Sequence, residues 1–200
     1  MLFNEPQTLL DGELGTVRYF PNCLSEEAAS RAFEILHATV PWESHRRQMY
    51  DREVDVPRLM AMFDLDGGNV PAPLLAARPA VEALSDHRFN SAGLNLYRNG
   101  NDSVAPHNDK LHSLIEGAPI ALLSLGDTRR FTLRTKASPK RKFDLDLEPG
   151  SLLVMSYATQ LHLDHGIPKT KATVNPRISV VFRERPAVFR DRYASYQTNG

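Results

Sequence analysis

The feature that most constrains the fold is a series of short apolar segments after Phe89, each bounded by turn residues. They read GLNLY, PIALLSLG, RRFTLRT, KFDLDLEPG, SLLVMSY and RISVVFRE. Their β-branched and aromatic content predicts strands, and FDLDLEPG alternates apolar and polar residues as a half-buried antiparallel strand does. EPGS and RNGND predict turns. Strands at roughly 10–20-residue spacing, with no long helix between them, predict an antiparallel barrel or a jelly roll.

The residues before this series are expected to contain helices. LSEEAASRAFEILHATVPW predicts a helix that Ser25 caps and Pro41 ends. A second helical segment is expected from Pro73 to Asp86, with Pro79 splitting or restarting it. The fold class is therefore α+β, mainly β. Residues 1–88 are expected to form a helical and lid segment packed on a β-rich core of residues 89–200, within one structural domain.

The composition is that of an ordinary globular protein, with 42% apolar and 24% charged residues in 200. A formal net charge of zero gives no global field that would announce a nucleic-acid partner. The single cysteine, Cys23, allows no internal disulfide and fits a reducing compartment. The start of the chain does not resemble a secretion signal, and no apolar run approaches the about 18 residues of a membrane-spanning helix. A cytoplasmic location is expected.

A candidate metal site begins at APHNDK. If these residues enter a strand, His107 and Asp109 lie on one face, because side chains at i and i+2 point the same way. QLHLDHGIP, further along the chain, offers His162 and His165 as a third ligand. Two histidines and one carboxylate leave half of an octahedron open, which suits Fe(II) that must bind a co-substrate and oxygen together. A structural zinc site would instead use four protein ligands, commonly thiolates.

Two arginines close the series of strands. Arg177 and Arg183 are an even number of residues apart, so on one strand they face the same side as Ser179 and Val181. Guanidinium groups that face a barrel interior need anions. A dicarboxylate ligand would satisfy both, since arginine binds carboxylates in a bidentate way. The alternative is a surface strand whose arginines point outward.

These motifs, in this order, resemble the AlkB family of Fe(II)/2-oxoglutarate-dependent dioxygenases, and within it the nucleic-acid alkylation repair branch. The resemblance runs from about Phe89 to Arg185, roughly half of the chain. It consists of Asn95-X-Tyr97, the Asn-Gly turn, His107-X-Asp109, PIALLSLG, RRFTLR, GSLLVM, HLDHGIP and Arg177 with Arg183. A His-X-Asp pair alone is a weak signal, whereas the ordered set is specific.

The resemblance implies a double-stranded β-helix, or jelly roll, with N-terminal helices and a substrate lid. It also implies roles for individual residues. His107, Asp109 and His165 would bind Fe(II). Arg177, helped by Asn95 and Tyr97, would bind the distal carboxylate of 2-oxoglutarate, and Arg183 would face the carboxylate nearer the metal.

The activity that the resemblance implies is oxidative dealkylation of N-alkylated bases in DNA or RNA, which consumes O2 and releases aldehyde, succinate and CO2. The base must be unstacked to reach the metal, which favours single strands or a flipped base. A monomer is expected. Leu111 stands where the family often has an acidic residue that contacts the base, and Ser179 where it often has asparagine. Two alternatives stay open: a 2-oxoglutarate-dependent hydroxylase of a protein or small molecule, and a non-enzymatic cupin-like binding module.

Two further groups of residues bear on the substrate. The aromatic residues nearest the expected lid are Trp42, Tyr50 and Phe63, and core packing explains each of them at least as well as base stacking does. Basic residues are expected either to contact phosphates or to be solvated charges. They are Arg46, Arg47, Arg52, the KASPKRK hairpin tip at residues 136–142, Lys169 and Lys171.

Overall fold

The structure is a computed structural model that describes residues 5–49 and 52–189. The strands are β1 (Gln7–Leu10), β2 (Val17–Phe20), β3 (Glu43–Met49), β4 (Arg52–Asp64), β5 (Ser91–Tyr97), β6 (Val104–His107), β7 (Ile120–Gly126), β8 (Arg129–Thr135), β9 (Lys142–Leu147), β10 (Leu152–Met155), β11 (Leu163–Ile167) and β12 (Arg177–Arg183). The helices are α1 (Glu26–Thr39), α2 (Ala72–Ser85), α3 (Tyr157–His162) and a short 3-10 helix, η1 (Leu111–Ser113). None of these helices has the length and apolar character that a bilayer crossing requires.

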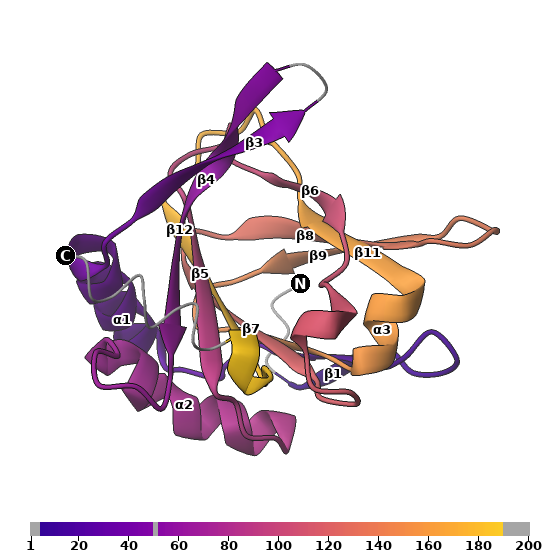
Figure 1. Cartoon of the computed structure of the whole chain (residues 1–200), viewed down its shortest axis with the longest axis horizontal. Helices are drawn as coiled ribbons and strands as arrows, with labels where there is room; N and C mark the ends of the chain where they lie inside the picture. The colour runs from indigo at the N-terminus through magenta and orange to yellow at the C-terminus, as the bar shows by residue number, and fades with distance from the viewer. Residues whose placement is uncertain (1–4, 50–51, 190–200) are drawn as a thin grey trace.

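The described strands form two antiparallel sheets that face each other (Figure 1). The large sheet has the order β1-β2-β10-β7-β12-β5-β4-β3, and the small sheet has the order β6-β11-β8-β9. All six segments that were predicted to be strands after Phe89 are strands. The two-sheet antiparallel arrangement is the predicted jelly roll.

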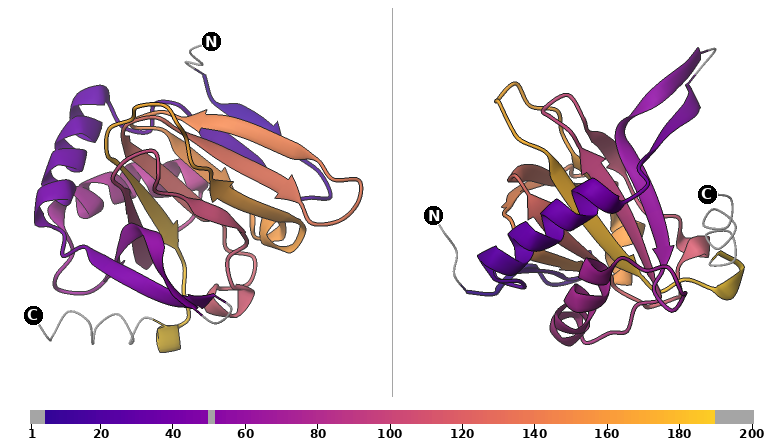
Figure 2. Two further views of the ribbon diagram at one scale, coloured as in Figure 1. Left: turned by 90° about the horizontal axis from the view of Figure 1, so that it is seen from above. Right: turned by 90° about the vertical axis from the view of Figure 1, so that its left-hand side faces the viewer.

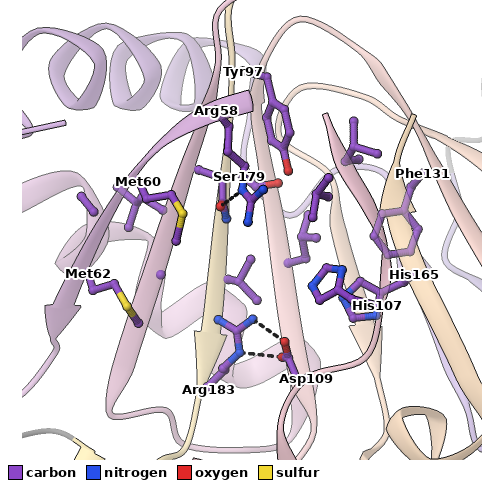
Figure 3. A pocket seen from close by; sticks show the side chains of 18 of the residues that line it. Arg58, Met60, Met62, Tyr97, His107, Asp109, Phe131, His165, Ser179 and Arg183 are labelled. Atoms are coloured by element: carbon purple, nitrogen blue, oxygen red, sulfur yellow. Dashed lines mark hydrogen bonds and ion pairs between the residues drawn. The ribbon is translucent and has the colours of Figure 1, made fainter. Parts of the chain in front are cut away.

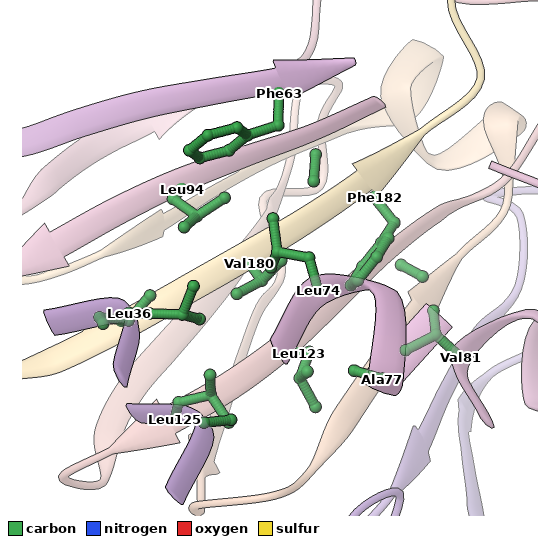
Figure 4. Close-up of a cluster of buried hydrophobic side chains, with 14 of the residues drawn as sticks. Leu36, Phe63, Leu74, Ala77, Val81, Leu94, Leu123, Leu125, Val180 and Phe182 are labelled. Atoms are coloured by element: carbon green, nitrogen blue, oxygen red, sulfur yellow. The ribbon is translucent and has the colours of Figure 1, made fainter. Parts of the chain in front are cut away.

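Both faces of the large sheet carry apolar side chains. Successive residues of each strand point to opposite faces. On β12, Ile178, Val180 and Phe182 point to one side, and the intervening residues point to the other. The first side packs under α1 and α2, where Leu36 and Leu74 meet the sheet (Figure 4). The second side faces the small sheet, and the two sheets enclose a second apolar cluster that includes Leu122 and Phe131. Helices thus cover one side of the large sheet and leave the other to the site (Figure 2).

The helices begin and end near the residues that the sequence predicts, but one predicted feature of α2 is absent. The Ser25 hydroxyl accepts a hydrogen bond from the Ala28 N–H at 3.2 Å, so Ser25 is the predicted N-cap of α1. Helix α2 does not split or restart at Pro79, which lies inside a continuous helix. Pro79 removes one backbone hydrogen bond. Burial of Ala77 and Val81 against the large sheet offsets that loss.

The first 88 residues contribute more strand than the helical reading of the sequence suggested. They supply β1 to β4, all of which belong to the large sheet. Strand β4 pairs with β5 from Leu59 opposite Leu96 to Asp64 opposite Ser91. Because β4 has apolar residues on both faces from residue 59 to 63, it lacks the alternation that would have identified it. Its pairing with β5 brings it to the edge of the central pocket.

Candidate active site

Two histidines are brought face to face by the pairing of β6 with β11. His107 lies directly opposite His165, and their ring centroids are 4.5 Å apart. Gly166 allows this close pairing, because a Cβ at that position would lie 2.7 Å from the carbonyl oxygen of Val104. One ligand atom from each of His107, His165 and Asp109 lies within 4.8 Å of the others. The three side chains therefore converge on one point, as Figure 3 shows.

Asp109 reaches this point from a loop, not from a strand. Strand β6 ends at His107, so the expectation of two ligands on one strand face does not describe the geometry. Two other contacts hold Asp109 in place. Its backbone N–H donates to Oε1 of Gln160 at 3.0 Å. Its carboxylate accepts hydrogen bonds from Nε and Nη2 of Arg183 at 2.7 and 3.0 Å.

The electrostatics keep Asp109 and His165 in the protonation states that bind a cation. Burial alone would raise the pKa of Asp109, but the charge and hydrogen bonds of Arg183 hold it well below its ordinary value. Burial, followed by the neighbouring charge of His107, lowers the pKa of His165 to about 3. At neutral pH Asp109 is therefore a carboxylate and His165 a neutral imidazole. The donor set fits a divalent metal such as Fe(II) and leaves further coordination positions open.

The opposite end of the pocket holds a buried cation. Arg177 is 0% exposed, and burial lowers its pKa to about 10, so it stays charged at neutral pH. Its Nε and Nη1 donate to the hydroxyl groups of Ser124 and Ser179 at 3.0 and 2.8 Å. Its Nη2 has no hydrogen-bond partner among the described residues. A buried guanidinium with an unused donor fits the carboxylate of a ligand.

Tyr97 lies opposite Arg177 in the large sheet, and Asn95 lies opposite Ser179, two residues further along β12. The guanidinium of Arg177 lies 5.5 Å from the Tyr97 ring centroid, and that of Arg129 lies 5.7 Å from it. Burial raises the pKa of the Tyr97 hydroxyl, so it is protonated at neutral pH and can donate to a carboxylate. Asn95 accepts a hydrogen bond from Nε of Arg58 at 2.7 Å. The residues at this end fit one arm of a dicarboxylate such as 2-oxoglutarate.

Six of the seven predicted site residues line one cavity of about 230 Å³, and the seventh, Arg177, binds Ser179 of its wall. Arg183 contacts the carboxylate of Asp109, a candidate metal ligand, whereas the resemblance implied a carboxylate of the co-substrate. His162 is exposed at the end of α3 and lies outside the candidate metal-ligating cluster.

Several residues of the site were not identified from the sequence. Strand β4 forms one wall with Arg58, Met60 and Met62, which lie on one face because they alternate (Figure 3). No alternation marked them in the sequence, because the intervening Leu59 and Ala61 are apolar as well. Gln160 carried no signal, because its importance comes from a partner far away in the sequence. Phe63 is a buried core residue and Trp42 packs against the same core, while Tyr50 lies outside the described residues.

The basic residues are distributed around the molecule. The hairpin tip at residues 136–142 joins β8 and β9, and Lys140 and Arg141 are exposed there. Lys169 and Lys171 are exposed on the loop between β11 and β12. Arg46 is exposed on β3, and the side chains of Arg47 and Arg52 lie outside the described residues.

The sequence of the chain is similar to those of known proteins. The sequence profile described as "2OG-Fe(II) oxygenase superfamily" matches residues 16–183. "Alpha-ketoglutarate-dependent dioxygenase alkB homolog 3" of Bos taurus is 33% identical over 186 residues, and the human protein of that name is 32% identical over 187. Each alignment covers 82% of this chain and 64% of the relative. "DNA oxidative demethylase ALKBH2" of Bos taurus is 35% identical over 158 residues, 70% of this chain and 57% of the relative.

The chain thus spans less than two thirds of the length of these curated relatives. A solved structure, described as "The structure of OsALKBH1", superposes with a TM-score of 0.64. The superposition covers 90% of this chain and 100% of that chain at 15% sequence identity. At this identity the likeness concerns the fold, and it confirms the predicted mainly-β jelly roll.

Proposed function

Because the chain belongs to the 2OG-Fe(II) oxygenase superfamily, we propose that it removes alkyl groups from nucleic-acid bases by oxidation. Its similarity to alkB homolog 3 and to ALKBH2 confirms the resemblance to the AlkB family and supports this substrate class. Membership of the superfamily also confirms the predicted set of Fe(II), 2-oxoglutarate and O2. The observation that carries the proposal is the buried Arg177, with an unused donor, in the same site as the His107, Asp109 and His165 cluster.

The residues at one end of the cavity would bind the metal, and those at the other end would bind 2-oxoglutarate. His107, Asp109 and His165 would hold the metal through two imidazole nitrogens and one carboxylate oxygen. Arg177 would bind the distal carboxylate of 2-oxoglutarate, with Tyr97 as a second donor. When bound, Fe(II) and 2-oxoglutarate together reduce O2, so that one oxygen atom hydroxylates the alkyl carbon next to nitrogen and the other enters succinate as CO2 leaves. The hydroxylated carbon departs as an aldehyde, and the ring nitrogen is restored.

The buried cation argues against a cupin-like module that binds only a metal. Such a module needs no charged guanidinium behind its cavity, and burying one costs free energy that a ligand carboxylate would recover. The candidate metal ligands lie inside the cavity between the two sheets, so a base would enter unstacked, from a single strand or by flipping. The protein is proposed to act as a monomer.

The test is a panel of oligonucleotides that carry 1-methyladenine or 3-methylcytosine, in single- and double-stranded DNA and RNA. The expected result is loss of the methyl group by mass spectrometry, with formaldehyde release that depends on Fe(II) and 2-oxoglutarate. If 2-oxoglutarate is converted to succinate while every oligonucleotide stays intact, the hydroxylase alternative replaces this proposal. The variant Asp109→Ala serves as the inactive control.

Phosphate contacts by the exposed hairpin tip can be tested separately. Removing the charges of Lys140 and Arg141 by serine substitution should weaken binding to oligonucleotides of any sequence, and should lower the slope of log affinity against log salt by about one per lost contact. Arg31→Ser is the matched control, because Arg31 is also exposed but lies on α1 and pairs with Glu27. An unchanged slope in the tip variant would identify these charges as solvated surface residues.

A further inference from the structure

Helix α3 is connected to two of the candidate metal ligands. The side-chain oxygen of its Gln160 accepts a hydrogen bond from the backbone N–H of Asp109 at 3.0 Å. The helix ends at His162, and strand β11, which carries His165, begins at the next residue. The position of α3 therefore affects one ligand through a side chain and another through the backbone.

The last turn of α3 takes hydrogen bonds from outside the helix. The helix has only six residues, and the carbonyl groups at the end of a helix have no donors within it. Lys136, at the start of the β8–β9 hairpin tip, supplies two donors. Its backbone N–H donates to the carbonyl oxygen of His162 at 2.9 Å, and its Nζ donates to the carbonyl oxygen of Gln160 at 2.6 Å. Lys136 thus holds the end of α3 at two points.

The surroundings of Lys136 suit an ammonium group. Carbonyl oxygens at the C-terminus of a helix carry partial negative charge, and lysine side chains bind them favourably. The carboxylate of Asp164 lies 4.0 Å from Nζ. The side chain of Lys136 is 30% exposed, whereas Lys140 and Arg141 on the same hairpin tip are exposed. Lys136 is therefore directed at the helix, unlike these two neighbours.

The charge of Lys136 by itself opposes a bound cation. It contributes to the lowered pKa of His165, after burial and the charges of His107 and Arg183. A positive charge that disfavours the protonated imidazole also disfavours a metal ion at the same nitrogen. A direct electrostatic effect of Lys136 and an effect through α3 therefore change the metal affinity in opposite directions.

We propose that Lys136 is a positioning residue for the metal site, which holds α3 so that Gln160 fixes the loop of Asp109. Its contacts are with the backbone of α3 and with Asp164, so it acts through another residue and not on the metal. The inference rests on the proposed function in one respect, because it takes His107, Asp109 and His165 as metal ligands.

The experiment measures the affinity of the full chain for Co(II) by calorimetry, together with the visible absorption of the bound Co(II), which depends on how the ligands are arranged. Lys136→Met removes the donor and the charge. It should lower the affinity about tenfold, as the loss of residues that orient metal ligands does, and should change the spectrum. Lys136→Arg keeps the donor and the charge, and should retain both the affinity and the spectrum. An unchanged or higher affinity in Lys136→Met would overturn the inference.

A double variant tests whether the effect passes through Gln160. In Gln160→Leu the N–H of Asp109 has already lost its acceptor on α3. Adding Lys136→Met to Gln160→Leu should therefore change the affinity by less than about twofold, since residues that act in series are not additive. Losses that multiply would mean that Lys136 acts independently of Gln160, which contradicts the proposal.

The controls separate positioning from general stability. Lys142→Met is the matched control, because Lys142 lies on the same hairpin and pairs with Asp144 at 2.6 Å. It should leave the affinity and the spectrum unchanged. If Lys136→Met lowers the melting temperature but leaves the Co(II) spectrum and affinity unchanged, Lys136 has only a structural role and the inference is wrong. Should Lys136→Met fail to fold, Lys136→Gln, which keeps a neutral donor, decides the question by the same two measurements.

These measurements also separate this inference from the proposed function, since they need neither an alkylated base nor turnover. If the chain binds the metal but removes no alkyl group, the proposed function is wrong, and the variants still decide the role of Lys136. If turnover proceeds and no Lys136 variant changes the affinity, only the role of Lys136 is wrong. If the wild type binds no metal ion, both proposals are wrong.

Discussion

The side-chain oxygen of Gln160 accepts a hydrogen bond from the backbone N–H of Asp109 at 3.0 Å. Gln160 is 1% exposed and lies on α3, and its amide donates to Oγ1 of Thr159 at 3.0 Å. Asp109 lies beyond the end of β6, so no strand ladder fixes its backbone there. Gln160 therefore positions the loop that carries a candidate metal ligand.

Gln160→Leu should weaken metal binding about ten- to a hundredfold, because residues that orient metal ligands have effects of this size. The measurement is a Mn(II) or Co(II) titration by calorimetry. Leu161→Ala is the matched control, since Leu161 is the next residue on α3 and is 48% exposed. Equal affinities for Gln160→Leu and the control would show that Asp109 needs no such support.

His107→Ala and Asp109→Ala should both abolish turnover, but they should differ in stability. His107 is exposed, so its loss should cost little. Asp109→Ala leaves Arg183 without its carboxylate in a site where both side chains are about nine-tenths buried. A loss of about 2–3 kcal/mol in the free energy of unfolding is expected.

A second substitution tests this explanation of the difference. Adding Arg183→Met to Asp109→Ala should restore most of the stability, since the uncompensated charge is gone, and should restore no activity. Chemical denaturation of the four proteins measures these differences. Retention of full activity in Asp109→Ala would mean that the metal site is wrongly assigned.

Arg177→Met should leave the stability of the ligand-free protein unchanged or higher, because it removes a buried charge with an unused donor. It should also abolish the rise in melting temperature that 2-oxoglutarate causes in the presence of Mn(II). Arg129→Met is the matched control, since Arg129 is equally buried but donates to three backbone carbonyls. That variant should lose about 2–3 kcal/mol of stability and keep its response to 2-oxoglutarate.

Asp102 should make stability depend on pH in the acid range. Burial alone would raise its pKa, but hydrogen bonds and charge from Arg98 hold it below the ordinary 3.8. A carboxylate with a lowered folded pKa stabilises the protein fully above the unfolded pKa, and this stabilisation is lost as the pH falls through the folded pKa. Asp102→Asn should therefore cost about 1–3 kcal/mol at neutral pH, and the difference should close below about pH 4.

Urea unfolding at a series of pH values measures this difference. Asp146→Asn is the control, because its pair with Arg130 is about half exposed and should contribute little at any pH. If the wild type and Asp102→Asn differ by the same free energy of unfolding at neutral and acid pH, the lowered pKa of Asp102 is not the cause.

The sequence by itself determined six strands of the jelly roll, those predicted after Phe89, and the faces of their residues. The two-residue period of a strand puts Arg177 and Arg183 on the side that faces the cavity, and the structure agrees. Ser25 caps α1 for an equally local reason, since the cap and its donor are three residues apart. Such features depend on neighbours in the chain, so a pattern in the sequence records them.

The tertiary structure decided the features that depend on distant partners. Gln160 and Asp109 are 51 residues apart, and Arg183 and Asp109 are 74 apart. Strand β4 becomes a wall of the cavity only through its register with β5, which also sets Met62 opposite Gly93. Periodicity fixes which face a side chain occupies, whereas register and close packing depend on the free energy of the whole fold. For that reason the residues of the candidate site were predictable from the sequence, but the contacts that support them and the shape of the cavity were not.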